Sequence, residues 1–360
     1  MNPKQKLLYL CPDYVRPAGG IRVIYRHVDI LRRHGYQAFV VHERQELRCR
    51  WFPSDTPVLG WTRRVHGQDM SLLRRAGRHI RRGLRDVPPE RMFLQFQEPP
   101  CFPIGLEDVV VIPEMFGPCL TEIAPGIPKV IFNQNAYFTF KQYPGDPQRV
   151  MSPYRHSDVV ATFVISEDSR RVITYAFPEA TVYRVRWSLD ATRFRPEYEK
   201  EPRISYMPRR GAADATHVLS TLAARGALDG YETVRIDGLD EDAVAACLRS
   251  SLIFLSLGYH EGLPLPPAEA MACGAIVVGY DGFGGREYML PELTFPVPAA
   301  DLISFAETLE RVLALHEERP EELRMRAVQA STFIRDHYSA QLEEEELLAA
   351  WRAVLDQTGS

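Results

Sequence analysis

Short apolar runs alternate along this chain with longer segments whose apolar residues recur at helical spacing. Apolar runs this short, bounded by helical segments, are typical of buried strands in a parallel sheet. Strands joined by helices, with right-handed crossovers, build Rossmann-like α/β domains. The sequence therefore predicts an α/β fold with two such domains facing each other across a cleft. The expected strands cover 7–11, 38–42, 92–96, 109–112, 130–133, 159–165, 182–185, 204–207, 233–236, 252–257 and 275–280.

The length of the chain and one Pro-bounded stretch set the expected division into domains. At 360 residues the chain exceeds what one ordinary core accommodates. The stretch 198–202 is charged and bounded by proline, as linkers often are. We expect a first domain over 1–197, a second over 198–340 and a final helix over 341–360.

Two carboxylates follow the apolar run 252–257. Glu261 lies on the expected loop, and Glu269 lies on the short helix that Pro266 and Pro267 begin. Ligands of parallel sheets bind beyond the carboxyl ends of the strands, and a helix N-terminus there favours phosphate. The carboxylates would then be free to accept hydrogen bonds from sugar and ribose hydroxyls, so the Glu-x7-Glu spacing predicts a nucleotide-sugar site. Alternatively, Glu269 only complements the helix dipole and Glu261 is a solvated loop residue.

Two further strand ends carry residues suited to a diphosphate. Arg209 and Arg210 follow the run 204–207, where guanidinium groups can bind a diphosphate bidentately. Gly19 and Gly20 precede a helix after the first run, where glycine lets the backbone approach a ligand closely. The alternatives are a surface arginine pair and a plain tight turn.

Polar residues after the run 130–133 are candidates for the acceptor side of the cleft. They are Asn133, Gln134, Asn135 and Tyr137, and their side chains could equally serve only to close the loop. A basic amphipathic segment at 71–85 could lie on an anionic membrane surface or meet an acidic acceptor. The alternative there is a solvated helix packed by its short apolar stripe.

The composition excludes some classes of protein. A net charge of −4 argues against a general nucleic-acid binder, and no apolar run approaches the length of a membrane span. The 6 cysteines are scattered without a Cys-x-x-Cys pair, which favours reduced thiols and no structural zinc. We expect a cytoplasmic protein, with attachment to the inner face of the membrane possible through 71–85. No cofactor and no metal are expected.

From about Ile236 to Met289 the chain resembles the retaining GT-B glycosyltransferases of family four, the glycosyl transferases group 1. The resemblance rests on an ordered set of motifs: Asp237-Gly238, Glu261-Gly262, Glu269-Ala270-Met271-Ala272-Cys273-Gly274, and Gly284-Gly285 with Glu287. It implies a GT-B fold whose C-terminal helix crosses back to the first domain, and transfer with retention of configuration.

The resemblance also implies roles for individual residues. The nucleotide base would lie near Gly238 and Leu239, and the Gly19-Gly20 loop would face the sugar diphosphate. The donor loop would include Gly262, Leu263 and Leu265. This chain departs from the family at Pro264, where the family usually has glycine, and it lacks the lysine that usually follows the basic residue at Arg209–Arg210.

The predicted function is transfer of a sugar from a UDP, GDP or dTDP sugar to a glycan, lipid-linked or small-molecule acceptor. Arg209 and Arg210 would stabilise the leaving diphosphate without a metal, Glu261 would orient the sugar, and Glu269 would hold the ribose. Three alternatives stay open: a glycoside hydrolase using both glutamates, a non-catalytic scaffold on a GT-B fold, and a sugar-nucleotide epimerase or phosphorylase.

Overall fold

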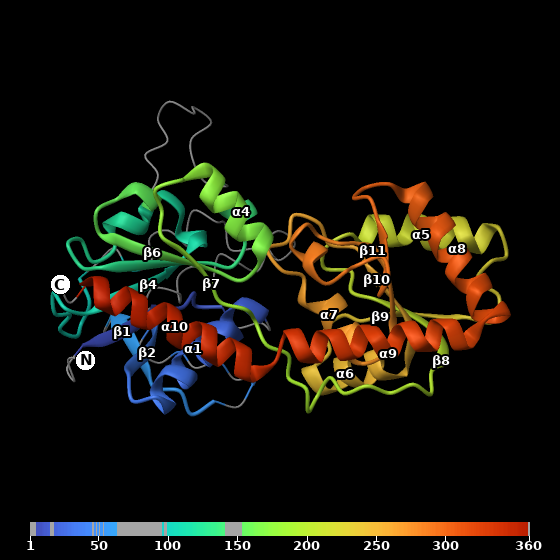
Figure 1. Ribbon diagram of the computed structural model, residues 1–360, viewed down its shortest axis with the longest axis horizontal. Coiled ribbons are helices and arrows are strands. Elements are labelled where there is room, and N and C mark those ends of the chain that lie inside the picture. Colours follow the sequence, from blue (N-terminus) through green and yellow to red (C-terminus); the bar gives the residue numbers. More distant parts are fainter. Residues whose placement is uncertain are drawn as a thin grey trace, which may run out of the picture.

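The computed structural model describes residues 5–14, 18–44, 47, 49, 51–52, 54–62, 96, 99–140 and 153–358. Two parallel sheets lie in separate halves of the molecule, and helices pack against each of them (Figure 1). The first sheet has the strand order β3-β2-β1-β4-β5-β6-β7 and the second has the order β12-β11-β10-β8-β9. All described pairs are parallel, as the short, wholly apolar runs predict.

The first sheet is built from β1 (Lys6–Leu10), β2 (Gln37–Arg44), β3 (Val58–Thr62), β4 (Val109–Pro113), β5 (Lys129–Asn133), β6 (Val159–Val164) and β7 (Val182–Arg184). The second is built from β8 (Glu201–Tyr206), β9 (Glu232–Arg235), β10 (Ser251–Ser256), β11 (Ile276–Tyr280) and β12 (Phe295–Val297).

The helices are α1 (Gly19–Arg33), α4 (Glu167–Ala176), α5 (Ala212–Ala224), α6 (Glu241–Ser250), α7 (Leu265–Ala272), α8 (Leu302–Glu318), α9 (Pro320–His337) and α10 (Ala340–Thr358). Short 3-10 helices are η1 (Glu114–Glu122), η2 (Ala136–Phe138), η4 (Pro153–Arg155) and η5 (Gly284–Glu287).

Local sequence explains where the helices begin and which face they bury. Ser166 caps α4 by accepting a hydrogen bond from the Ser169 N–H at 3.0 Å. Asp240 caps α6 in the same way, through the Ala243 N–H at 2.9 Å. The apolar stripe predicted for α1 is buried, and it consists of Ile21, Ile24, Val28 and Leu31.

Three features of the sheets differ from the sequence expectations. The strands β3 and β12 were not predicted, because Gly60 interrupts the apolar pattern of β3 and Pro296 interrupts that of β12. The expected linker 198–202 is also partly strand, since β8 begins at Glu201. The burial of Ile204 and Ser205 places this strand in the sheet. The expected strand 92–96, apart from Phe96, and the basic segment 71–85 lie outside the described residues.

The chain crosses between the two sheets after β7 and returns at the junction of α9 and α10 (Figure 1). The helix α10 lies along the first domain, where Trp351 is fully buried and donates to the Tyr9 hydroxyl at 2.8 Å. The Trp351 ring also packs edge-on against Phe163 of β6. The predicted crossing of the C-terminal helix back to the first domain is thereby confirmed. Within the described residues, no helix is both long enough and apolar enough to span a bilayer.

Candidate functional site

An ion pair joins two of the predicted catalytic residues. Arg210 follows β8 and Glu261 follows β10, and these strands are neighbours in the second sheet. Arg210 Nη1 lies 2.6 Å from Glu261 Oε2. Burial raises the pKa of Glu261, while the nearby charges of Arg210 and Arg209 oppose that rise. The Arg209 side chain is exposed, so Arg210 is the arginine that contacts Glu261 directly.

The N-terminus of α7 offers fewer backbone donors than a phosphate-binding helix usually does. The N-cap of this helix is Pro264, and Pro266 and Pro267 follow Leu265 at the second and third helical positions. Because proline has no N–H, only Leu265 supplies a donor among the four positions that a helix leaves without intrahelical partners. An anion at this site would therefore depend on arginine side chains more than on the helix end.

The loop after β10 touches the first domain at Gly262. A Cβ atom on Gly262 would lie 2.2 Å from the Gln134 carbonyl oxygen and 2.6 Å from Asn135 Cα, so only glycine fits there. The Asn135 side-chain amide donates to the His260 carbonyl oxygen at 3.1 Å. The two domains are thus in direct contact at the predicted donor loop.

The glycine pair that begins α1 lies against the same place. A Cβ on Gly19 would lie 2.8 Å from Leu265 Cδ1, and the Gln134 side-chain amide donates to the Gly20 carbonyl oxygen at 3.1 Å. Leu263, on the loop between Gly262 and Leu265, is buried. The structure therefore brings together predicted residues from three strand ends in two domains.

Glu269 lies further along α7, beside a group of charged residues from both domains. Arg22 of α1 binds Glu241 at the start of α6, and Arg193 of the crossing segment binds the same carboxylate at 2.6 Å. Burial raises the pKa of Glu269 to about 7, the nearby Glu241 adds to the rise, and Arg22 and Arg193 oppose it. None of the described residues donates a hydrogen bond to the Glu269 carboxylate, so this group is available to a ligand.

Gly238 and Leu239 form the turn between β9 and α6. Gly238 has a φ of 71°, in the left-handed region that favours glycine, and the Leu239 side chain is 44% exposed. The turn lies within three residues of Glu241, the residue that connects α6 to Arg22. The turn predicted to bind the base therefore lies near the charged residues that surround Glu269.

The four predicted acceptor-side residues do not share one environment. Asn133 is fully buried and donates to Thr139 at 2.9 Å and to Tyr154 at 2.7 Å, so this side chain closes its own loop. Gln134 and Asn135 make the interdomain contacts at Gly262, as described above. The partly exposed Tyr137 ring meets the His260 and Phe283 rings of the second domain at 5.8 and 5.3 Å between centroids.

Glu114 is a residue of this site that the sequence analysis did not identify. It follows β4, is buried, and accepts the backbone N–H groups of Gln134 and Asn135 at 3.1 and 3.0 Å. Burial raises the pKa of Glu114 to about 7. The sequence does contain a sign of this residue, namely a carboxylate directly after a wholly apolar strand. A residue in that position lies at the carboxyl edge of the sheet, where ligands bind.

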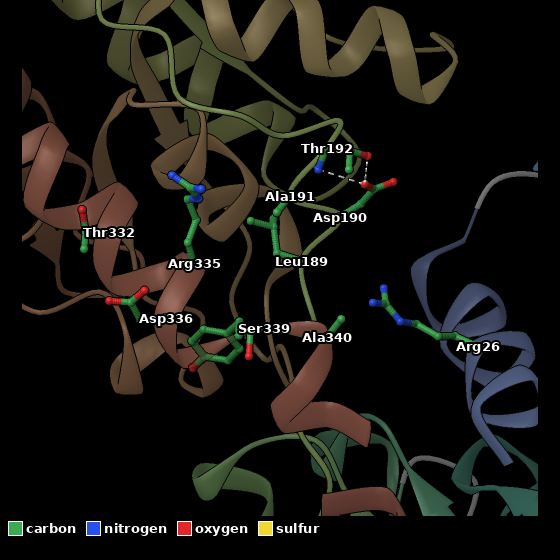
Figure 2. A pocket seen from close by; sticks show the side chains of 11 residues that line it. Arg26, Leu189, Asp190, Ala191, Thr192, Thr332, Arg335, Asp336, Ser339 and Ala340 are labelled. Carbon is green, nitrogen blue, oxygen red and sulfur yellow. Dashed lines mark hydrogen bonds between the residues drawn. The ribbon is translucent and has the colours of Figure 1, made fainter. Parts of the chain in front are cut away.

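A cavity of about 600 Å³ lies where the chain crosses between the domains, beside residues 189–192 and 338–340, and not at the predicted site. Arg26 of α1 faces it from the first domain, and Arg335 and Asp336 of α9 face it from the second (Figure 2). None of the predicted site residues lines this cavity. Over the part of the chain that the structure describes, no three His, Cys, Asp or Glu side chains are grouped to hold a metal ion.

Comparison with solved structures confirms the predicted GT-B fold. Sucrose-phosphate synthase from Thermosynechococcus elongatus superimposes with a TM-score of 0.71 at 12% identity, over 98% of this chain and 100% of that chain. HepE from Anabaena, in complex with UDP-glucose, gives 0.62 at 11% identity, over 97% and 99%. WaaG, a glycosyltransferase involved in lipopolysaccharide biosynthesis, gives 0.56 at 13% identity, over 95% and 98%.

A family comparison confirms the predicted resemblance for part of the second domain. Residues 232–331 match the family described as glycosyl transferases group 1. The matched region extends from β9 into α9 and includes both glutamates of the Glu-x7-Glu motif. A comparison with curated protein sequences finds no match.

Proposed function

We propose that this GT-B chain, with its glycosyl transferases group 1 region, is a glycosyltransferase that uses a nucleoside-diphosphate sugar as donor. The acceptor would be a glycan, a lipid-linked molecule or a small molecule. We further propose that transfer retains the anomeric configuration and needs no metal. Retention rests on the family resemblance, and metal independence rests on the two arginines beside the proposed diphosphate position.

The observation that carries the proposal is the ion pair between Arg210 and Glu261, which lies on the loop that contacts the first domain and precedes the helix of Glu269. Negative charge develops on the diphosphate as the bond to the sugar breaks. Arg210 and Arg209 would stabilise that charge, and preplaced donors of this kind give large rate effects. Because Arg210 contacts Glu261 at 2.6 Å, the same arginine links the diphosphate position to the carboxylate proposed to orient the sugar.

The remaining residues would bind the nucleotide and exclude water. Glu269 would accept hydrogen bonds from the ribose hydroxyls, and Gly238 and Leu239 would lie against the base. The contact of Gly262 with Gln134 leaves no room for a ligand between them, so the donor would enter when the domains separate. Closure would then keep water from hydrolysing the donor.

Nucleotide binding tests this proposal without knowledge of the acceptor. We would measure melting temperatures with UDP, GDP, dTDP and ADP, with and without EDTA, for the parent protein and Glu269→Ala. A nucleotide at about one hundred times its Kd stabilises the folded state by about 2.7 kcal/mol. We expect one nucleotide to raise the parent melting temperature regardless of EDTA, and the rise to shrink in Glu269→Ala. An unshifted panel would contradict the proposal.

The second candidate function is a non-catalytic scaffold on the GT-B fold. The prolines at the start of α7 favour it, because they remove three backbone donors that could have reached a phosphate. A scaffold would bind none of the four nucleotides and would leave UDP-glucose intact over long incubation. Release of UDP by the parent protein would rule this candidate out.

A further inference from the structure

Oppositely charged side chains connect the two domains at a second place, beside η5. Glu287 Oε2 accepts the backbone N–H of Glu167 at 2.8 Å, and Glu287 Oε1 accepts from Arg184 at 2.6 Å. Arg286 Nη1 lies 3.7 Å from Asp168 Oδ1. We call these five residues the clasp, with Arg286 and Glu287 in the second domain and the other three in the first.

The clasp is well placed to hold the domains together. Glu287 meets the first N–H of α4, where a negative charge favours the helix dipole, and it also meets a guanidinium group. The Glu287 and Arg184 side chains are 15% and 23% exposed, so solvent screens this pair less than a surface pair. Tyr338, at the junction of α9 and α10, adds a third donor at 2.6 Å.

These contacts occupy both oxygens of Glu287. One oxygen accepts from Glu167, and the other accepts from both Arg184 and Tyr338. Glu287 is therefore not available to bind a sugar or a phosphate while the clasp is formed. Any influence of this residue on transfer must act through the positions of other groups.

The clasp is directly connected to Glu261 through the backbone. The Glu261 N–H donates to the Gly282 carbonyl oxygen at 2.9 Å, and the Gly284 N–H donates to the Glu261 carbonyl oxygen at 3.1 Å. Glu287 lies three residues beyond Gly284 in the same short segment. A displacement of this segment from the first domain would therefore carry Glu261 with it.

We propose that Glu287 is a positioning residue that holds the domains closed and sets the position of Glu261 relative to the first domain. The closing role depends only on the contacts above, whereas the effect on transfer rests on the proposed function. Because water enters an incompletely closed site, loss of the clasp should favour hydrolysis of the donor over transfer.

The first test is Glu287→Gln, examined by small-angle X-ray scattering. A glutamine amide has one acceptor oxygen and presents N–H groups where the carboxylate accepted two donors. We expect a larger radius of gyration than in the parent protein. Glu292→Gln is the matched control, since this exposed glutamate contacts none of the described charged residues and should leave the scattering unchanged. An unchanged radius in Glu287→Gln would overturn the closing role.

The second test separates positioning from general structural damage. In Glu287→Gln we expect kcat for transfer to fall about tenfold, the ratio of hydrolysis to transfer to rise, and the Kd for the nucleotide identified by the binding panel to change less than twofold. An unchanged ratio of hydrolysis to transfer would overturn the positioning role. If none of the four nucleotides binds either protein, the proposed function fails, and scattering still decides the closing role.

A double-mutant cycle keeps the inference testable if one variant folds poorly. Arg184→Gln and Glu287→Gln should each expand the protein, and the double variant should expand it no further than Glu287→Gln alone, because that change already breaks the contact with Arg184. Tyr338→Phe removes a single hydrogen bond at the clasp and should give a smaller expansion. Additive expansion by Arg184→Gln and Glu287→Gln would contradict the clasp.

Discussion

Two segments that follow β8 contact the first domain, the loop at Gly262 in the cleft and the helix α10, and the two contacts differ in their chemistry. At the cleft, Gly262 approaches the backbone of Gln134 and Asn135, and polar groups make the hydrogen bonds. Along α10, Trp351 is fully buried against the first domain and bonds to Tyr9. Contacts between backbone and polar groups can part and be solvated, whereas separating a buried aromatic surface exposes apolar area to water. We therefore expect the domains to separate at the cleft, whereas α10 stays packed on the first domain.

The largest expected effect is on stability, from Trp351→Ala. Removing a buried tryptophan should lower the free energy of unfolding by about 3–5 kcal/mol, because transfer energy is lost and a cavity remains. Denaturant unfolding measures this change. Tyr175→Ala is the control, since the Tyr175 side chain is 91% exposed and should contribute little. A loss below about 1 kcal/mol would contradict a permanent contact along α10.

The next effect is on rate, from Arg210→Met. Loss of one charged donor to the leaving diphosphate should lower kcat by about 10²–10³, or about 2.7–4 kcal/mol, with a smaller change in the melting temperature. Steady-state transfer from the nucleotide sugar identified by the binding panel measures it. Arg225→Gln is a matched control, because Arg225 forms an exposed ion pair with Glu310 in the same domain. An unaltered kcat would remove Arg210 from the proposed mechanism.

A smaller effect should follow from Gly262→Ala, which tests whether the cleft must close. The added methyl group would collide with the Gln134 carbonyl oxygen, and overpacking of this kind costs about 1–3 kcal/mol. Because the domains can open to relieve the collision, we expect transfer to fall more than the melting temperature does. Normal transfer at a reduced melting temperature would show the opposite, that the contact serves stability alone.

The smallest effect concerns pH and Glu269. With a pKa of about 7, this carboxyl is largely protonated at pH 6 and largely ionised at pH 8. An ionised acceptor binds hydroxyl donors more strongly, so nucleotide affinity should rise about fivefold between these values, or about 1 kcal/mol. Calorimetric titration of Glu269→Gln should show no such rise in affinity.

The raised pKa of Glu269 should also make the ligand-free protein less stable as pH rises from 4.5 to 7, since over this range the folded state keeps a proton that the unfolded state has released.

Much of the fold and the composition of the site could be predicted from local sequence. Short apolar runs and helical segments determined the order of strands and helices, because each pattern matches the period of the structure it forms. The edge strands β3 and β12 escaped prediction, since Gly60 and Pro296 interrupt their apolar patterns. The Glu-x7-Glu motif indicated Glu261 and Glu269, because its spacing joins the end of a buried strand to a helix.

Pairings between distant residues depended on the tertiary structure. From the sequence, Arg209 and Arg210 were equal candidates for the diphosphate site. In the structure, Arg210 is the one that forms an ion pair with Glu261. Asn133 and Asn135 also look alike in the sequence, yet Asn133 turns into the first domain and Asn135 reaches the second. The direction of a side chain at a strand end depends on what packs there, which local patterns do not encode.

The sequence by itself determined the α/β architecture, the glycine and proline positions and the acidic and basic groups that supply the chemistry. Only the tertiary structure decided which groups meet across the cleft, which glutamates are buried enough for a raised pKa, and where Glu287 anchors the second domain. The physical reason is range. Periodicity and capping act over a few residues, whereas burial and ion pairing depend on segments more than one hundred residues apart in the chain.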